Sequence, residues 1–140
     1  MRFFLIVLVL TLSCTPPPTS SAICDSTRDD QNGEFEILLN EISGGCGYIG
    51  KLDVVLEDGV IYPDEDLGCT TPEISWYGDM CKTRSTFKCD DGRWKTEMIW
   101  SVITYPEDRD RIYGSLKTKM DLLDAFYVCE STYHMEGIRQ

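Results

Sequence analysis

Seven cysteines carry most of the chemistry that this sequence offers. Six of them follow residue 23, at Cys24, Cys46, Cys69, Cys81, Cys89 and Cys129. None of these cysteines forms the short C-x-x-C spacing of a zinc site, so disulfide bonds are favoured over metal ligation. The even number predicts three disulfides and folding in an oxidising compartment.

The sequence alone does not determine which cysteines pair, because six cysteines allow many connectivities. We expect two local bonds, Cys81–Cys89 and Cys46–Cys69, between cysteines that are close in the chain. The third bond, Cys24–Cys129, would join the start of the domain to its last strand. Each bond is expected to stabilise the fold by roughly 2–4 kcal/mol.

The seventh cysteine, Cys14, stands at the end of a hydrophobic run. Arg2 precedes the apolar segment Phe3–Leu12, which has the pattern of a secretory signal and is too short to span a bilayer. Two processing routes remain open. A signal peptidase could cut after Ala22, which closes a small-x-small motif, or Cys14 could itself be the processing site.

The stretch Leu10-Thr11-Leu12-Ser13-Cys14 resembles a bacterial lipobox, although Thr11 stands where Leu is preferred. The resemblance implies that the thiol of Cys14 carries a diacylglycerol and that cleavage frees its amine for another acyl chain. Thr15, in place of Asp, implies sorting to the outer membrane. We therefore favour a lipoprotein of the bacterial cell envelope, with simple secretion as the alternative.

These observations predict three regions. Residues 1–13 are a signal peptide, and residues 14–23 are a lipidated cysteine followed by a Pro/Ser/Thr-rich tether. Residues 24–140 are one disulfide-stapled domain. The tether is uncharged and contains three consecutive prolines, so we expect an extended spacer. Two or three acyl chains would hold such a protein stably at a membrane.

The chain is acidic, with a formal net charge of −11. Nucleic-acid binding requires a basic face, so this class of partner is excluded. Direct adhesion to anionic lipid headgroups is disfavoured for the same reason. The charge is compatible with a basic protein partner, and equally with solubility alone.

Residues suited to catalysis or to metal binding are few. His134 is the only histidine, and its place on an alternating strand predicts a solvated side chain. No nucleophile elbow, H-E-x-x-H motif or phosphate-binding loop occurs. The loops "YPDEDLGC" and "YPEDRDR" are the best calcium candidates, but both lack the EF-hand spacing and are interpreted as solvated turns. We expect no cofactor, no metal and no enzymatic activity.

The elements that position these residues show a period of two. Alternation occurs over residues 34–40, 51–57, 82–102, 115–122 and 127–135, with turns at Asp58-Gly59 and at 90–92. A helical stripe at Leu116, Met120 and Leu123 competes with the strand over 115–122, and the strand is favoured. The pattern predicts an all-β, antiparallel, barrel-like meander of about seven or eight strands, closed or nearly closed.

Aromatic residues offer one candidate binding surface. Trp94 and Trp100 share a predicted strand face with Met98 and are expected in the core. Trp76 and Tyr77 lie in the loop-like stretch "PEISWYGDM", and we predict that this aromatic pair is exposed and binds a ligand.

The region from Ile42 to Gln140 resembles a class of small uncharacterised bacterial lipoproteins. The resemblance rests on the segments "GGCG", Gly68-Cys69, "CKTRSTFKC", "YGSLKTKM" and the ending "CESTYHMEGIRQ". The resemblance implies export, lipidation and a disulfide-bonded β-domain, and no activity.

The segment "FKCDDGRWKTEMIW" is also similar to a hairpin of membrane-anchored inhibitors of C-type lysozymes. Those inhibitors are small β-barrels that insert a loop into the lysozyme cleft, and an acidic surface would suit a basic lysozyme. An acidic loop packed beside the hairpin of residues 89–94 would favour this alternative. A deep polar cleft with His134 and two carboxylates would instead favour an enzyme.

Overall fold

The computed structural model describes residues 24, 31–47, 50–123 and 127–140. These residues form one antiparallel sheet of eight strands. The strands are β1 (Gly33–Gly44), β2 (Gly50–Glu57), β3 (Val60–Ile61), β4 (Glu73–Tyr77), β5 (Lys82–Asp90), β6 (Trp94–Tyr105), β7 (Asp108–Leu122) and β8 (Tyr127–Arg139). Two short 3-10 turns, η1 (Glu65–Leu67) and η2 (Gly78–Met80), flank β4.

The predicted all-β class and the strand over residues 115–122 are confirmed. The predictions for residues 1–23, which include the signal peptide, the lipidation of Cys14 and the tether, lie outside the described residues. Within the described part, no helix is long and apolar enough to cross a membrane.

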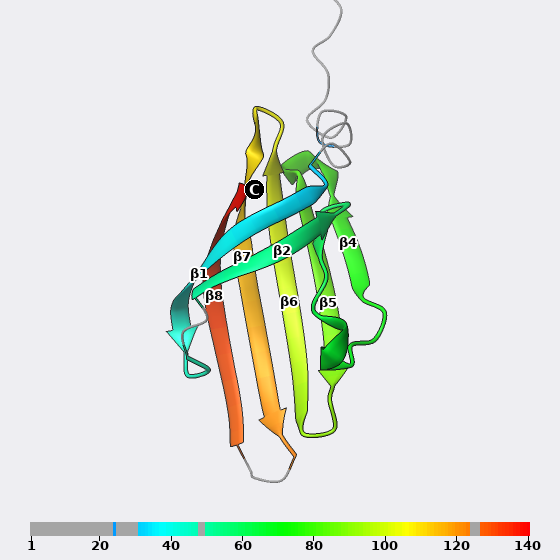
Figure 1. The fold of residues 1–140 in the computed structure, drawn as a ribbon, viewed down its shortest axis with the longest axis vertical. Helices are drawn as coiled ribbons and strands as arrows, with labels where there is room; N and C mark the ends of the chain where they lie inside the picture. Colours follow the sequence, from blue (N-terminus) through cyan, green and yellow to red (C-terminus); the bar gives the residue numbers. More distant parts are fainter. Residues whose placement is uncertain (1–23, 25–30, 48–49, 124–126) are drawn as a thin grey trace, which may run out of the picture.

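The strand order is β3-β2-β1-β8-β7-β6-β5-β4. This is the order of an eight-stranded up-and-down ring that is open between β3 and β4. The sheet curls into a half-barrel in which β1 and β2 cross diagonally over the long strands β5 to β8 (Figure 1). The predicted closure is therefore incomplete, and the two ends of the sheet are the edges of β3 and β4.

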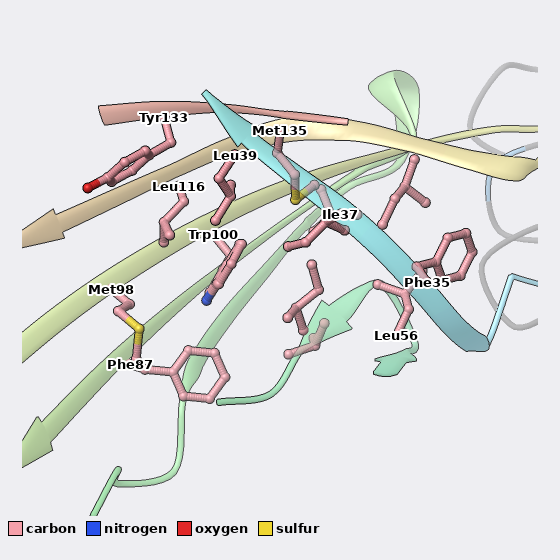
Figure 2. Close-up of a cluster of buried hydrophobic side chains, with 14 of the residues drawn as sticks. Phe35, Ile37, Leu39, Leu56, Phe87, Met98, Trp100, Leu116, Tyr133 and Met135 are labelled. Carbon is pink, nitrogen blue, oxygen red and sulfur yellow. The ribbon is translucent and has the colours of Figure 1, made fainter. Parts of the chain in front are cut away.

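The core fills the concave side of this half-barrel, because alternate side chains of each strand point inward. Phe35, Ile37 and Leu39 of β1 are fully buried; Ile37 and Leu39 lie near Trp100 of β6, and Phe35 lies beside Leu56 of β2 (Figure 2). The core is completed by Leu56, Val60, Ile61, Phe87, Cys89, Val102, Ile112, Leu116, Tyr133 and Met135. Trp94 is half-buried at its edge. The inward faces predicted from alternation are thus confirmed.

Both predicted turns are present. Asp58 and Gly59 have φ values of 50° and 80°, and they join the paired residues Glu57 and Val60. This is the mirror-image hairpin turn that Asp-Gly favours. The turn after Asp90 is fixed by Asp91, whose carboxylate accepts hydrogen bonds from the backbone.

Three disulfides form, as predicted, but the predicted pairing is wrong. The observed bonds are Cys24–Cys81, Cys46–Cys129 and Cys69–Cys89. Cys81 and Cys89 stand at opposite ends of β5, and eight residues of strand span roughly 26 Å, so they cannot meet. Cys46 follows β1, whose neighbour is β8, and it therefore reaches Cys129 on that strand.

Candidate functional site

The single histidine lies on the outer surface of the half-barrel. His134 is exposed on the outward face of β8, where its Nε2 lies 3.3 Å from the carboxylate of Glu136. Its cross-strand partners are Asn40 and Ser115, so no second carboxylate faces the ring in register. Within the described residues, no group of three or more His, Cys, Asp or Glu side chains is placed to hold a metal.

The candidate aromatic pair lies in strand β4 and not in a loop. Trp76 is paired with the buried Thr83 and is therefore on the inward side of the sheet. Tyr77 is paired with Lys82 on the outward side, and the Lys82 Nζ lies 5.7 Å from the centre of its ring. Because adjacent strand residues point to opposite faces, the two aromatic rings do not form one platform.

The opening of the ring contains a cleft of about 510 Å³ between the β3–β4 loop and strands β4 and β5. We call it the acidic cleft and define it by six of its lining residues: Tyr62, Asp64, Glu65, Cys69, Ile74 and Phe87. Phe87 is a buried core residue, and Tyr62 packs edge-on against it with ring centroids 5.8 Å apart. The cleft is therefore lined by apolar side chains and by two exposed acidic residues, Asp64 and Glu65.

The loop that carries these carboxylates is fastened to the end of β5. The Cys69–Cys89 disulfide joins the two segments covalently. The N–H of Thr70 donates to the carbonyl of Lys88 at 2.9 Å, and the N–H of Asp90 donates to the carbonyl of Gly68 at 3.2 Å. The acidic loop is thus packed beside the hairpin of residues 89–94, which is the arrangement expected of the inhibitor alternative.

The neighbouring hairpin also has a defined conformation. The Asp91 carboxylate accepts hydrogen bonds from the N–H groups of Trp94, at 2.7 Å, and Arg93, at 2.9 Å. These bonds, that of Trp94 foremost, lower the pKa of the Asp91 carboxyl below its usual value. The Asp91 carboxylate therefore stays ionised to a lower pH than an aspartate without these hydrogen bonds.

Charge is distributed unevenly around the half-barrel. Residues 31–73 contain ten acidic residues and one basic residue, a net charge of −9. Residues 82–122, which form β5 to β7, contain nine basic and seven acidic residues, a net charge of +2. The acidic cleft lies where this acidic part of the chain meets the basic strand β5.

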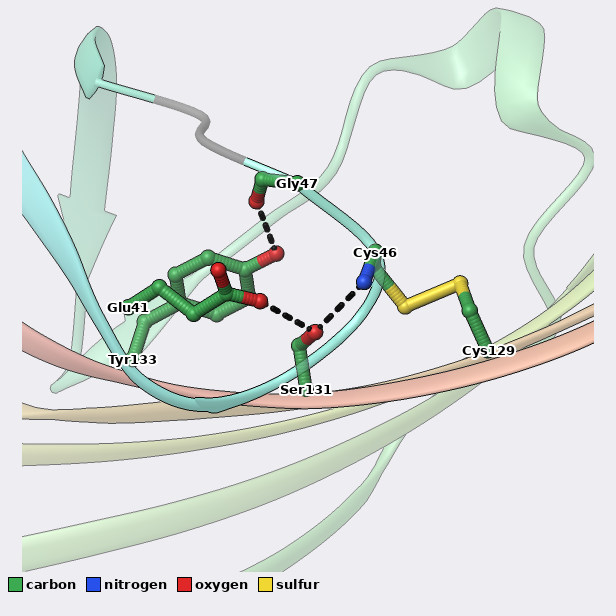
Figure 3. The surroundings of a disulfide bond; sticks show 6 residues. All are labelled: Glu41, Cys46, Gly47, Cys129, Ser131 and Tyr133. Carbon is green, nitrogen blue, oxygen red and sulfur yellow. Dashed lines mark hydrogen bonds between the residues drawn. A yellow bond between two sulfur atoms is a disulfide. The ribbon is translucent and has the colours of Figure 1, made fainter.

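A second polar cluster surrounds the Cys46–Cys129 disulfide (Figure 3). Ser131, which is 4% exposed, donates to the carboxylate of Glu41 at 2.7 Å and accepts from the N–H of Cys46 at 2.8 Å. The Tyr133 hydroxyl donates to the carbonyl of Gly47 at 2.7 Å. Both hydrogen bonds of the Ser131 hydroxyl join β8 to the end of β1 and the loop that follows it. We call this cluster the clamp at Ser131, because it holds that loop against β8.

Sequence reasoning did not find this clamp or the acidic cleft. The register of β1 against β8 shifts between Glu41 and Ser43, so simple alternation does not place the Glu41 side chain. Asp64 and Glu65 stand in "YPDEDLGC", which by itself has the pattern of a solvated turn. Knowledge that Cys69 pairs with Cys89 would have identified the cleft, because this bond places the loop of Asp64 and Glu65 against the end of β5.

No protein-family model, no curated protein and no solved structure matches this chain.

Proposed function

We propose that this chain is a lipid-anchored binding module of a bacterial cell envelope, that it acts without catalysis, and that it holds a basic protein at the acidic cleft. The observation that carries the proposal is the cleft itself. Asp64 and Glu65 line a cleft that also contains apolar side chains, and a disulfide fixes the loop that bears these two acidic residues.

A lysine or arginine side chain suits this cleft. Its methylene stem would pack against Tyr62, Ile74 and Phe87, while its charged end would reach the carboxylates. The surrounding negative charge would accelerate the encounter with a basic partner and would weaken with added salt. The acidic cleft therefore supports both recognition and steering.

The cysteine pairing supports the proposed anchor. The three disulfides use every cysteine after residue 23, so Cys14 is the one thiol left for acylation. Disulfides of this kind are formed by exported proteins. We propose acylation of Cys14 at the outer membrane, with the secreted form as the alternative.

The anchor is tested by the intact mass of the full-length chain after expression in a bacterium that processes lipoproteins. We expect the membrane fraction to contain a protein that begins at Cys14 with two or three acyl chains. Cys14→Ser should move the protein out of this fraction, because the acylation site is lost. An unmodified N-terminus at Ile23 in the soluble fraction contradicts the anchor and leaves secretion.

A second candidate function is inhibition of a lysozyme-like hydrolase. The observation that favours it is the acidic loop held beside the hairpin of residues 89–94 by Cys69–Cys89. In this case the basic partner is the hydrolase, and its catalytic cleft is blocked by the acidic loop.

Neutralising Asp64 and Glu65 tests whether the acidic cleft binds a basic protein, which both candidate functions require. We expect the double variant Asp64→Asn/Glu65→Gln to weaken binding of a C-type lysozyme by about tenfold or more, because both cleft carboxylates are lost. The variant Glu34→Gln/Asp53→Asn removes the same charge from β1 and β2 and should change binding less than threefold. Titration calorimetry measures binding, and a cell-wall turbidity assay measures inhibition.

The two readouts have different consequences. Binding without inhibition rejects the inhibitor and retains the binding module. Equal weakening by both double variants would show that only the net charge matters and would contradict recognition at the acidic cleft.

A further inference from the structure

The two edges of the sheet differ in how well they are protected. Strand β3 has two residues, Val60 and Ile61, which are buried against β5 and β6. Strand β4 has five residues and, in the described part of the chain, pairs only with β5. It contains no lysine, proline or bulge, which are three of the features by which natural edge strands avoid pairing with other chains; its one charged residue, Glu73, stands at its start, directly after Pro72.

Ile74 shows what this edge exposes. It is paired with the buried Ser85, so its side chain is on the inward side of the sheet. It is nevertheless 45% exposed, because no described strand continues the ring beyond β4. A strand added to β4 would cover Ile74 and would place its own alternate side chains over the acidic cleft.

We infer that β4 pairs with an extended segment of another polypeptide that carries lysine or arginine at alternate positions. This inference rests on the proposed function and states how the basic partner is held. Backbone hydrogen bonds to β4 would supply affinity, as in other cases of strand addition. The basic side chain that enters the cleft beside Ile74 would supply specificity through Asp64 and Glu65.

Charge complementarity favours a basic segment over a second copy of this chain as the partner of β4. The chain has a net charge of −11, and β4 itself contributes Glu73 and no basic residue. Pairing of two β4 strands would bring two acidic clefts together. A segment with several basic residues instead neutralises Asp64 and Glu65.

The test uses the mature protein in detergent and a fluorescent peptide, Lys-Thr-Lys-Val-Lys-Thr-Lys. The control peptide has the same sequence but is N-methylated at its three central residues, which removes hydrogen-bond donors from both of its edges and keeps its charge. We expect the control peptide to bind at least tenfold more weakly in fluorescence anisotropy. The unmodified peptide should slow hydrogen exchange of β4 amides.

Two lysine variants of the protein complete the test. We expect Ile74→Lys to weaken peptide binding by about tenfold, because it places a positive charge in the cleft that the peptide must enter. Val55→Lys adds the same charge on β2, where the side chain is 57% exposed, and should change binding less than twofold. Thermal melts of both variants confirm that they are folded.

Three outcomes overturn the inference. In the first, the two peptides bind equally and β4 amides are not protected, but neutralisation of Asp64 and Glu65 still weakens binding. The acidic cleft is then a binding site, and pairing of the peptide with β4 is rejected. In the second, the protein binds lysozyme through these carboxylates but does not bind the peptide. This result also keeps the acidic cleft as a binding site and rejects pairing of the peptide with β4. A concentration-dependent dimer that Ile74→Lys abolishes would assign the edge to a second copy.

Discussion

Removal of the Cys46–Cys129 disulfide, by Cys46→Ala together with Cys129→Ala, is expected to lower the free energy of unfolding by about 4 kcal/mol. The bond closes a loop with a sequence separation of 83 residues, so its loss greatly increases the conformational entropy of the unfolded chain. It also releases the loop after β1 from β8, where the clamp at Ser131 depends on the position of Cys46. Urea unfolding measures the effect.

The matched control is the double alanine variant of Cys69 and Cys89. This bond has a sequence separation of 20, so its removal is expected to cost about 3 kcal/mol, less than that of Cys46–Cys129. The order should reverse for binding, because Cys69 holds the acidic loop against β5, whereas Cys46 is bonded to β8, which β7 and β6 separate from β5. A larger loss of stability from the Cys69–Cys89 variant would contradict the loop-entropy argument.

The fold class was predictable because alternation of side chains survives in almost every strand. Phe87 and Cys89 face inward and Lys88 faces outward, as their polarity indicates. The Asp58-Gly59 turn was predictable because few dipeptides adopt its positive φ values. Alternation and turn chemistry are local properties, so a sequence reveals them directly.

The disulfides and the candidate site depended on long-range geometry. Neighbouring cysteines in the chain were expected to pair, but β5 separates Cys81 from Cys89 by its full length. Strand β4 is five residues between Pro72 and Gly78, and a run so short between turn residues has the pattern of a loop. The true partner of Cys69 and the strand β4 both lie at the opening of the ring, which is where the acidic cleft and the exposed Ile74 are found.

Gly114→Ala is expected to destabilise the domain by about 4 kcal/mol or more, an effect in the range of the most damaging single substitutions. Gly114 lies within β7, between Val102 of β6 and Met135 of β8. A Cβ atom there would overlap the carbonyl oxygen of Ser101, which is backbone and cannot rotate away. The glycine also has a φ of 156°, which side chains rarely allow.

Gly92→Ala is the control that separates these two causes. Gly92 has a φ of 88°, but no other group lies within 4 Å of a Cβ at this position. We expect it to cost about 1–2 kcal/mol, the penalty of the backbone conformation alone. The remainder at Gly114 then measures how closely β6 and β7 approach each other. If the two substitutions cost the same in urea unfolding, β7 can move away from Ser101, and the sheet that presents the acidic cleft is less rigid than its packing indicates.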